Sequence, residues 1–119
     1  RVYDWNFLKN YSGKIRLGLK MLSEKNAYLL MGNKRKMIDL PDIEKIDHAA
    51  LALLSKNSLD LSLGLKNLTL DQAEILGNGF GSLSLPKISR LMRTGKFDSI
   101  NKRQGSIKFL DYHRDEIIN

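Results

Sequence analysis

The chain of 119 residues is long enough for one domain with a hydrophobic core, since 42% of it is hydrophobic and 28% is charged. It has no Cys, which excludes disulfides and thiolate metal sites. None of its apolar runs approaches the ~20 residues that cross a bilayer, so we expect no membrane insertion. The net charge is +7, but residues 1–36 carry +7, residues 37–76 carry −4 and residues 77–119 carry +4. Two basic ends thus flank an acidic middle, and the sequence defines no single basic face for nucleic acid.

The first predicted element is a short helix in DWNFLKNY, residues 4–11. Asp4 is a suitable cap for this helix, and Trp5, Phe7 and Leu8 form its apolar side. The helix lies one repeat length before the next predicted helix, so we expect it to cover the first strand as a half-unit.

Four short strands are predicted next, each opening with an apolar–polar–apolar triplet. This alternation is typical of a strand with one buried face. The triplets open at Ile15, Ile38, Leu61 and Leu83, so successive strands lie 23, 23 and 22 residues apart. We expect the strands to centre on residues 15–18, 38–41, 61–64 and 83–86, and to pair in parallel in that order.

Three helices are predicted after the first three strands, at residues 23–31, 47–55 and 69–76. They open at Ser23, Asp47 and Thr69, which are residue types that cap helix N-termini well. Gly32 and the glycines of residues 77–79 supply stop signals.

The pattern weakens after Leu91, because residues 92–105 show no clean helical period. Residues 107–118 resemble a degenerate fifth unit, in which we expect Ile107 and Phe109 to point inward.

Two pairs of matching segments show that the units repeat. Residues 15–30, IRLGLKMLSEKNAYLL, and residues 61–76, LSLGLKNLTLDQAEIL, share seven of sixteen residues. Residues 38–46, IDLPDIEKI, and residues 83–91, LSLPKISRL, share their apolar skeleton and hold the two prolines of the chain. The sequence therefore predicts units of about 23 residues, each with a strand, a tight turn and a short helix.

Such units must stack, because each helix is too short to be stable alone and each strand has no partner within its own unit. We expect a parallel sheet on one side, helices on the other and a core between them. The predicted core residues are Leu17, Leu22, Leu40, Ile46, Leu63, Leu68, Leu85 and Leu91. The single predicted domain divides into a half-unit (1–14), four units (15–37, 38–60, 61–82 and 83–106) and a degenerate C-terminal unit (107–119).

This LxLPxLxxL pattern with a capped, Ala-containing helix resembles the divergent leucine-rich-repeat-like arrays of bacterial proteins, over residues 15–91. The resemblance implies an α/β fold, a short solenoid with a parallel sheet on one face. It also implies a repeat protein that serves as a binding scaffold, most often for proteins, without enzyme activity. The family's usual Asn or Cys ladder is absent, and Ile43, Leu65 and Ile88 stand in its place.

The sequence contains no group of residues with the types and spacing of a catalytic, metal or cofactor site. His48 falls in a predicted first helical turn, and His113 lies among carboxylates with no second His at ligand spacing. The glycines of GNGFGS, residues 77–82, precede a strand and lack the Lys of a phosphate loop, so we interpret them as turn residues. We expect no enzyme activity and no cofactor.

The leading hypothesis is a scaffold that binds a protein or peptide through the exposed strand face or the turns between units. The polar residues between the inward leucines should form one row on that face, with Lys14, Asp60 and Ser82 beside it. The row consists of Arg16, Asp39, Ser62 and Ser84. The alternative is electrostatic binding of nucleic acid or another polyanion through the basic ends. Its candidate residues are Lys34, Arg35, Lys36, Arg90, Arg93 and Lys96.

Overall fold

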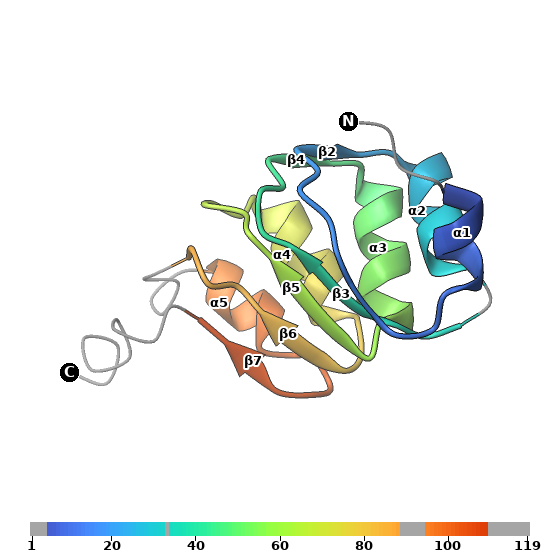
Figure 1. Ribbon diagram of the computed structural model, residues 1–119. Helices are drawn as coiled ribbons and strands as arrows, with labels where there is room; N and C mark the ends of the chain where they lie inside the picture. The colour runs from blue at the N-terminus through green and yellow to red at the C-terminus, as the bar shows by residue number, and fades with distance from the viewer. Residues whose placement is uncertain (1–4, 33, 89–94, 110–119) are drawn as a thin grey trace.

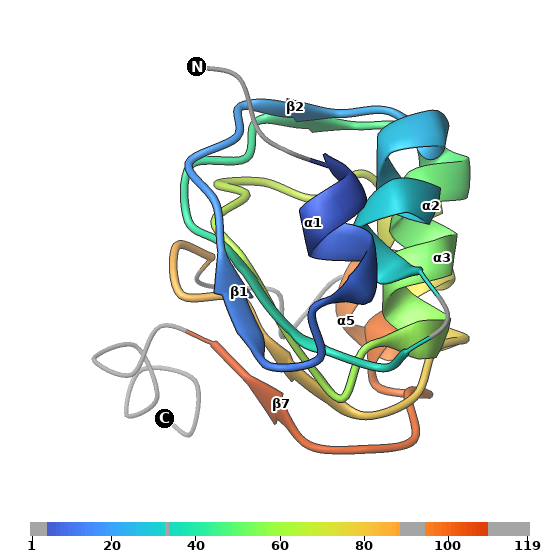
Figure 2. The same ribbon diagram turned by 45° about the vertical axis from the view of Figure 1, so that its right-hand side comes forward.

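A parallel sheet faces a layer of helices in the computed structural model, which describes residues 5–32, 34–88 and 95–109 (Figures 1 and 2). The protein is therefore of the α/β class, as the sequence predicts. The sheet has five strands in the order β1-β3-β5-β6-β7. They span Lys14–Arg16 (β1), Met37–Leu40 (β3), Asp60–Leu63 (β5), Ser82–Ser84 (β6) and Ile107–Lys108 (β7).

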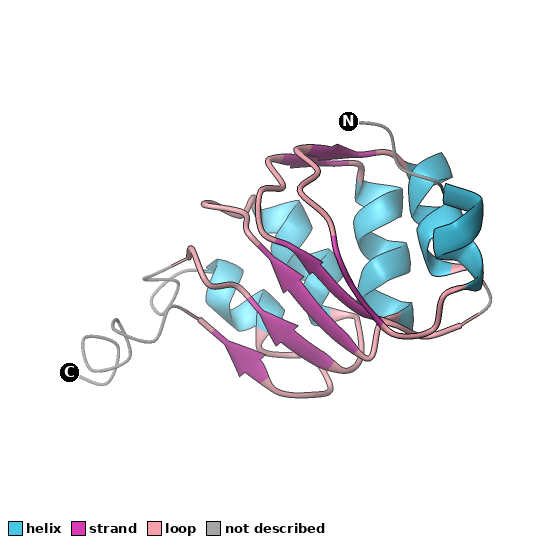
Figure 3. Cartoon of the chain, viewed as in Figure 1, coloured by secondary structure: helices cyan, strands magenta, loops and turns pink. Residues whose placement is uncertain are grey.

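Five helices in the described part of the chain form the second layer, on one side of the sheet (Figure 3). They span Trp5–Asn10 (α1), Glu24–Met31 (α2), His48–Asn57 (α3), Leu70–Gly77 (α4) and Gly95–Ile100 (α5). Each helix packs against the next one in chain order. None of the helices in the described ranges is long and apolar enough to cross a membrane.

The strand register agrees with the prediction from the sequence. Asp39 pairs with Arg16 on one side and with Ser62 on the other, and Ser62 pairs in turn with Ser84. Each strand lies about one residue earlier than predicted. β3 ends directly before Pro41, because proline has no N–H to donate to the ladder.

The helix starts also form as predicted, with one change of role. The hydroxyl oxygen of Ser23 accepts a hydrogen bond from the Asn26 N–H at 3.3 Å. Thr69 and Gln72 form a reciprocal capping box at the start of α4. Asp47 precedes α3, but its carboxylate does not cap that helix and instead accepts the N–H of Glu24 at 3.2 Å. Asp47 therefore stabilises the first turn of the neighbouring helix, α2.

Two elements differ from what the sequence pattern suggests. Gly95–Ile100 form α5 in the stretch that shows no helical period, because this helix has only six residues and one buried side chain, that of Ile100. A second, two-stranded parallel sheet joins Met21–Leu22 (β2) to Lys45–Ile46 (β4). It lies ahead of α2 and α3 and ties their starts together.

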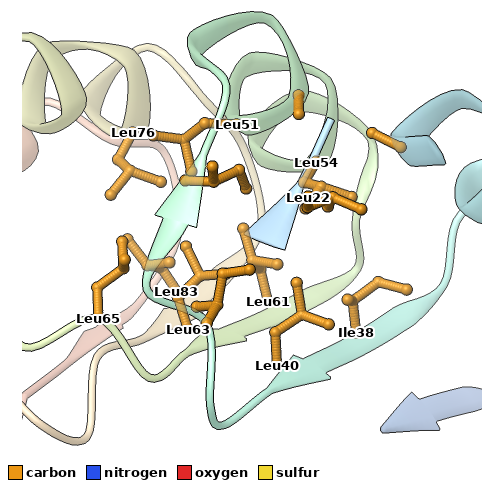
Figure 4. Packing of buried hydrophobic residues seen from close by; sticks show 14 of the residues in the cluster. Leu22, Ile38, Leu40, Leu51, Leu54, Leu61, Leu63, Leu65, Leu76 and Leu83 are labelled. Carbon is orange, nitrogen blue, oxygen red and sulfur yellow. The ribbon is translucent and has the colours of Figure 1, made fainter. Parts of the chain in front are cut away.

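A core of leucine and isoleucine fills the space between the sheet and the helices (Figure 4). Seven of the predicted core residues are buried: Leu17, Leu22, Leu40, Ile46, Leu63, Leu68 and Leu85. Leu91 lies outside the described residues. Ile43, Leu65 and Ile88 are buried as well, so apolar side chains fill the turns that follow the strands. Ile107 and Phe109 pack against the end of the core as expected.

Candidate functional site

The face of the sheet that points away from the helices carries a row of polar side chains. Arg16, Asp39, Ser62 and Ser84 stand opposite one another across β1, β3, β5 and β6, and Lys108 of β7 continues the row. They alternate along each strand with buried leucine and isoleucine, so their side chains point outward.

A second row lies beside the first, one pleat earlier. Lys14 pairs with Met37, Met37 with Asp60, and Asp60 with Ser82. Lys14, Asp60 and Ser82 are the predicted flanking residues, and Met37 adds an exposed apolar side chain between them.

The two rows together line a shallow hollow of about 170 Å³ on the sheet face. Its polar lining comprises Lys14, Asp39, Asp60, Ser62 and Ser84, and Met37 contributes apolar surface. The structure therefore brings three of the four predicted row residues into one concave surface, with Arg16 at its edge.

Arg16 and Asp39 interact as expected from their positions. The Nε atom of Arg16 lies 3.7 Å from Oδ2 of Asp39, and their side chains are 71% and 21% exposed. An ion pair with so much solvent contact is weak, so a bound partner can replace it at little cost. The Asp60 carboxylate makes no hydrogen bond or ion pair to any described residue. It is therefore available to a donor from a partner.

Lys36 departs from the expectation that it contacts a polyanion at the surface. Its side chain is fully buried, and its ammonium donates to the backbone carbonyls of Leu8 and Leu30 and, at 3.4 Å, to that of Lys9. These carbonyls lie at the C-terminal ends of α1 and α2, where backbone acceptors lack partners within the helix. Burial lowers the pKa of Lys36 from its ordinary value, and the charge of Lys34 lowers it further. Lys36 therefore stabilises helix ends and is not a surface contact.

The other basic candidates do not form one surface in the described ranges. Lys34 is exposed, and Arg35 donates to the Ser58 carbonyl at 3.4 Å. Lys96 is half-buried on α5, at the other end of the helix layer. Arg90 and Arg93 lie outside the described residues.

Arg103 is a buried cation that the sequence pattern does not single out. Its guanidinium donates to the carbonyls of Leu76, Phe80 and Gly81, and to both the hydroxyl and the carbonyl of Ser55. Burial lowers the pKa of Arg103 to about 10, so the group stays charged at neutral pH. It ties the end of α5 to α3 and α4, and only its place in the fold reveals this role.

Metal ligands are not brought together in the part of the chain that the structure describes, where no three His, Asp or Glu side chains form a cluster. His48 is exposed in the first turn of α3, and His113 lies outside the described residues. Gly77 is the last residue of α4, and Gly79 and Gly81 lie in the turn between α4 and β6.

No protein-family model, curated protein or solved structure matches the chain.

Proposed function

We propose that the chain is a non-catalytic interaction scaffold that binds a protein or peptide through the outward face of its sheet. In this proposal its α/β fold is a short leucine-rich-repeat-like solenoid, and the stacked units serve to align one polar position per unit. The regular spacing of the strands and the packing of each helix against the next support the repeat architecture.

The observation that carries the proposal is the outward row itself. Arg16, Asp39, Ser62 and Ser84 lie in register over a rigid backbone, and most of them line one hollow. Strands in such a sheet lie ~4.8 Å apart, so the row presents a polar group at each step along the stack.

The chemistry of this face suits an extended, polar partner. Ser62 and Ser84 are small and offer hydroxyls that both donate and accept hydrogen bonds. Asp39 and Asp60 add acceptors, and Met37 offers one adaptable apolar contact. An extended peptide lying across the strands could place successive polar groups on successive units. A hydrophobic helix would find too little apolar surface there.

Polyanion binding through the basic ends has weaker support. Lys36 is occupied by helix carbonyls, and Lys34 and Arg35 lie far along the stack from Lys96. A steep fall in partner affinity with rising salt would favour the polyanion hypothesis over the peptide one.

A peptide selection tests the proposal. Linear peptides from a random displayed library are selected on the wild-type protein, and their affinities are compared with those for a variant that combines Ser62→Lys with Ser84→Lys. Two long cationic side chains fill the hollow, so we expect the affinity to fall at least about tenfold, or ~1.4 kcal/mol. A second variant, Arg16→Ala with Asp39→Ala, removes the ion pair that competes with the peptide. We expect a measurable rise or fall in peptide affinity, and an unchanged affinity would place these two residues outside the binding site.

The matched control places the same charge change of +2 on the helix side, where Glu74 on α4 is exposed and Glu74→Lys leaves the sheet untouched. Circular dichroism checks that every variant folds. Selected peptides that bind the wild type, the strand-face variants and the helix-face variant equally would show that the strand face is not the site.

A further inference from the structure

A larger hollow, of about 440 Å³, lies among the turns that follow the strands. It is separate from the strand face, since none of its lining residues belongs to a strand of the five-stranded sheet. Its size falls within the ~300–1,000 Å³ that is usual for small-molecule sites.

The hollow arises because long and short turns alternate along the stack. The turns with proline place one more residue before the next buried side chain than the turns with Leu-Gly-Leu do. The short turn at Gly64 therefore lies between the long turns at Pro41 and Pro86. The side chain of Lys87 crosses this gap, because its ammonium donates to the Pro41 carbonyl, two units away, at 2.7 Å.

Gly64 allows the turns to approach one another. A Cβ atom at this position would lie 1.9 Å from the Pro41 carbonyl oxygen, so any other residue would force the two turns apart. The amide of Gly64 donates to the Leu40 carbonyl at 2.9 Å and fixes the short turn in place. Buried Ile43 and Leu65 lie beside it as an apolar floor.

The rim of the hollow carries charges of both signs that do not neutralise one another. Lys20, Lys66 and Lys87 contribute ammonium groups, and Asp42 and Glu44 contribute carboxylates. Within the described residues, none of these five side chains forms an ion pair, and only Lys87 makes a hydrogen bond. Lys20 and Lys66 hold equivalent places in the two Leu-Gly-Leu-Lys segments, so the repeat itself brings the cations to opposite sides of the acidic turn.

We propose that this hollow binds a small zwitterion of the amino-acid type, with an ammonium and a carboxylate on a short apolar body. A simple anion would be attracted by the lysines but repelled by Asp42 and Glu44, and a simple cation would face the reverse. A zwitterion turns its carboxylate to Lys66 and Lys87 and its ammonium to Asp42 and Glu44. Its carboxylate also replaces the Pro41 carbonyl as the acceptor for Lys87, so that both donor and acceptor carry a charge and the hydrogen bond is stronger.

The experiment compares three probes by NMR titration of the isotopically labelled protein: leucine, N-acetylleucine and leucinamide. Leucine carries both charges, and each of the other two lacks one. We expect saturable shifts of the amides of residues 64–67 with leucine, and binding about fivefold weaker with either blocked probe, as the loss of a partly exposed ion pair predicts.

Charge variants assign the two ends of the ligand. Asp42→Asn should weaken leucine about fivefold but leave N-acetylleucine unweakened, whereas Lys66→Gln should weaken both. Lys56→Gln on the exposed surface of α3 is the matched control and should change neither. Spectra of the variants outside residues 41–44 and 64–67 report whether the fold is kept.

Two outcomes would overturn the proposal. Equal binding of leucine and N-acetylleucine would show a plain anion site, in which Asp42 and Glu44 do not take part. Absence of saturable shifts at residues 64–67 with millimolar leucine would show that the hollow is only a solvated surface. Neither outcome bears on the strand face, whose peptide test is independent.

Discussion

Leu63 illustrates how a single side chain depends on the stack around it. It is fully buried on β5 and pairs with Leu40 of β3, while β6 lies on its other side. Both neighbouring backbones are held by the sheet, so the structure has little room to collapse around a shorter side chain. We expect Leu63→Ala to lower the free energy of unfolding by about 2–5 kcal/mol in denaturant melts.

Leu59 provides the matched control for this substitution. Its side chain is 51% exposed just before β5, so Leu59→Ala should stay within about 0.5 kcal/mol of the wild type, as is usual for surface substitutions. A loss well under ~1 kcal/mol for Leu63→Ala would contradict its inward position.

Whether a side chain points into the core could be predicted within the strands, where apolar and polar residues alternate. Lys36, just before β3, shows where this rule stops working. Lys36 has the parity of Ile38 and Leu40, both buried, so extending the strand alternation by one step places it inside. The same parity also points Leu59 inward, and Leu59 is exposed. Alternation fails at strand ends, because the nearby helix carbonyls decide whether a side chain turns in. Those carbonyls are set by tertiary structure.

At the scale of elements, the ends of α1 and α2 depend on a residue that belongs to neither helix. The Lys36 ammonium contacts the Leu8 and Leu30 carbonyls, and so joins the end of α1 to the end of α2. Replacing Lys36 by Met keeps the apolar stem but leaves buried carbonyls without a donor. We expect Lys36→Met to cost about 1–3 kcal/mol of stability.

Hydrogen exchange locates this effect on the chain. The backbone amides of α1 should exchange faster in Lys36→Met, because α1 contacts the rest of the protein mainly through α2. The amides of α3 should keep their protection. Lys34→Met, two residues earlier and exposed, should leave α1 unchanged. Equal exchange of α1 in both variants would mean that Lys36 does not hold this helix.

Element prediction succeeded for the segments with both a period and a cap. Ser23 and Thr69 start helices as their residue types suggest, and the strands follow the alternation. α5 was missed because six residues with one buried side chain produce no measurable period. The β2–β4 pair was missed because two residues are too few to alternate, and only the tertiary fold brings Met21 beside Lys45.

For the whole molecule, the repeat spacing predicts which residues become neighbours across the sheet. Arg16, Asp39 and Ser62 are far apart in the sequence and become adjacent because the strands that carry them open 23 residues apart and pair in register. The hollow at Gly64 was not predicted, because it depends on how a long turn and a short turn pack together. The row on the strand face was predicted, because the alternation within each strand and the spacing between strands together determine it.

Site-specific photo-crosslinking tests the central claim, that partners lie on the outward face of the sheet. A photoreactive phenylalanine analogue replaces Lys108, which is exposed on β7 beside the hollow of the strand face, in one sample and Lys56, on the exposed side of α3, in another. Each sample is irradiated with a peptide selected on the wild type. We expect the peptide to be captured from position 108 and not from position 56. Capture from position 56 alone, or equal capture from both, would contradict the account.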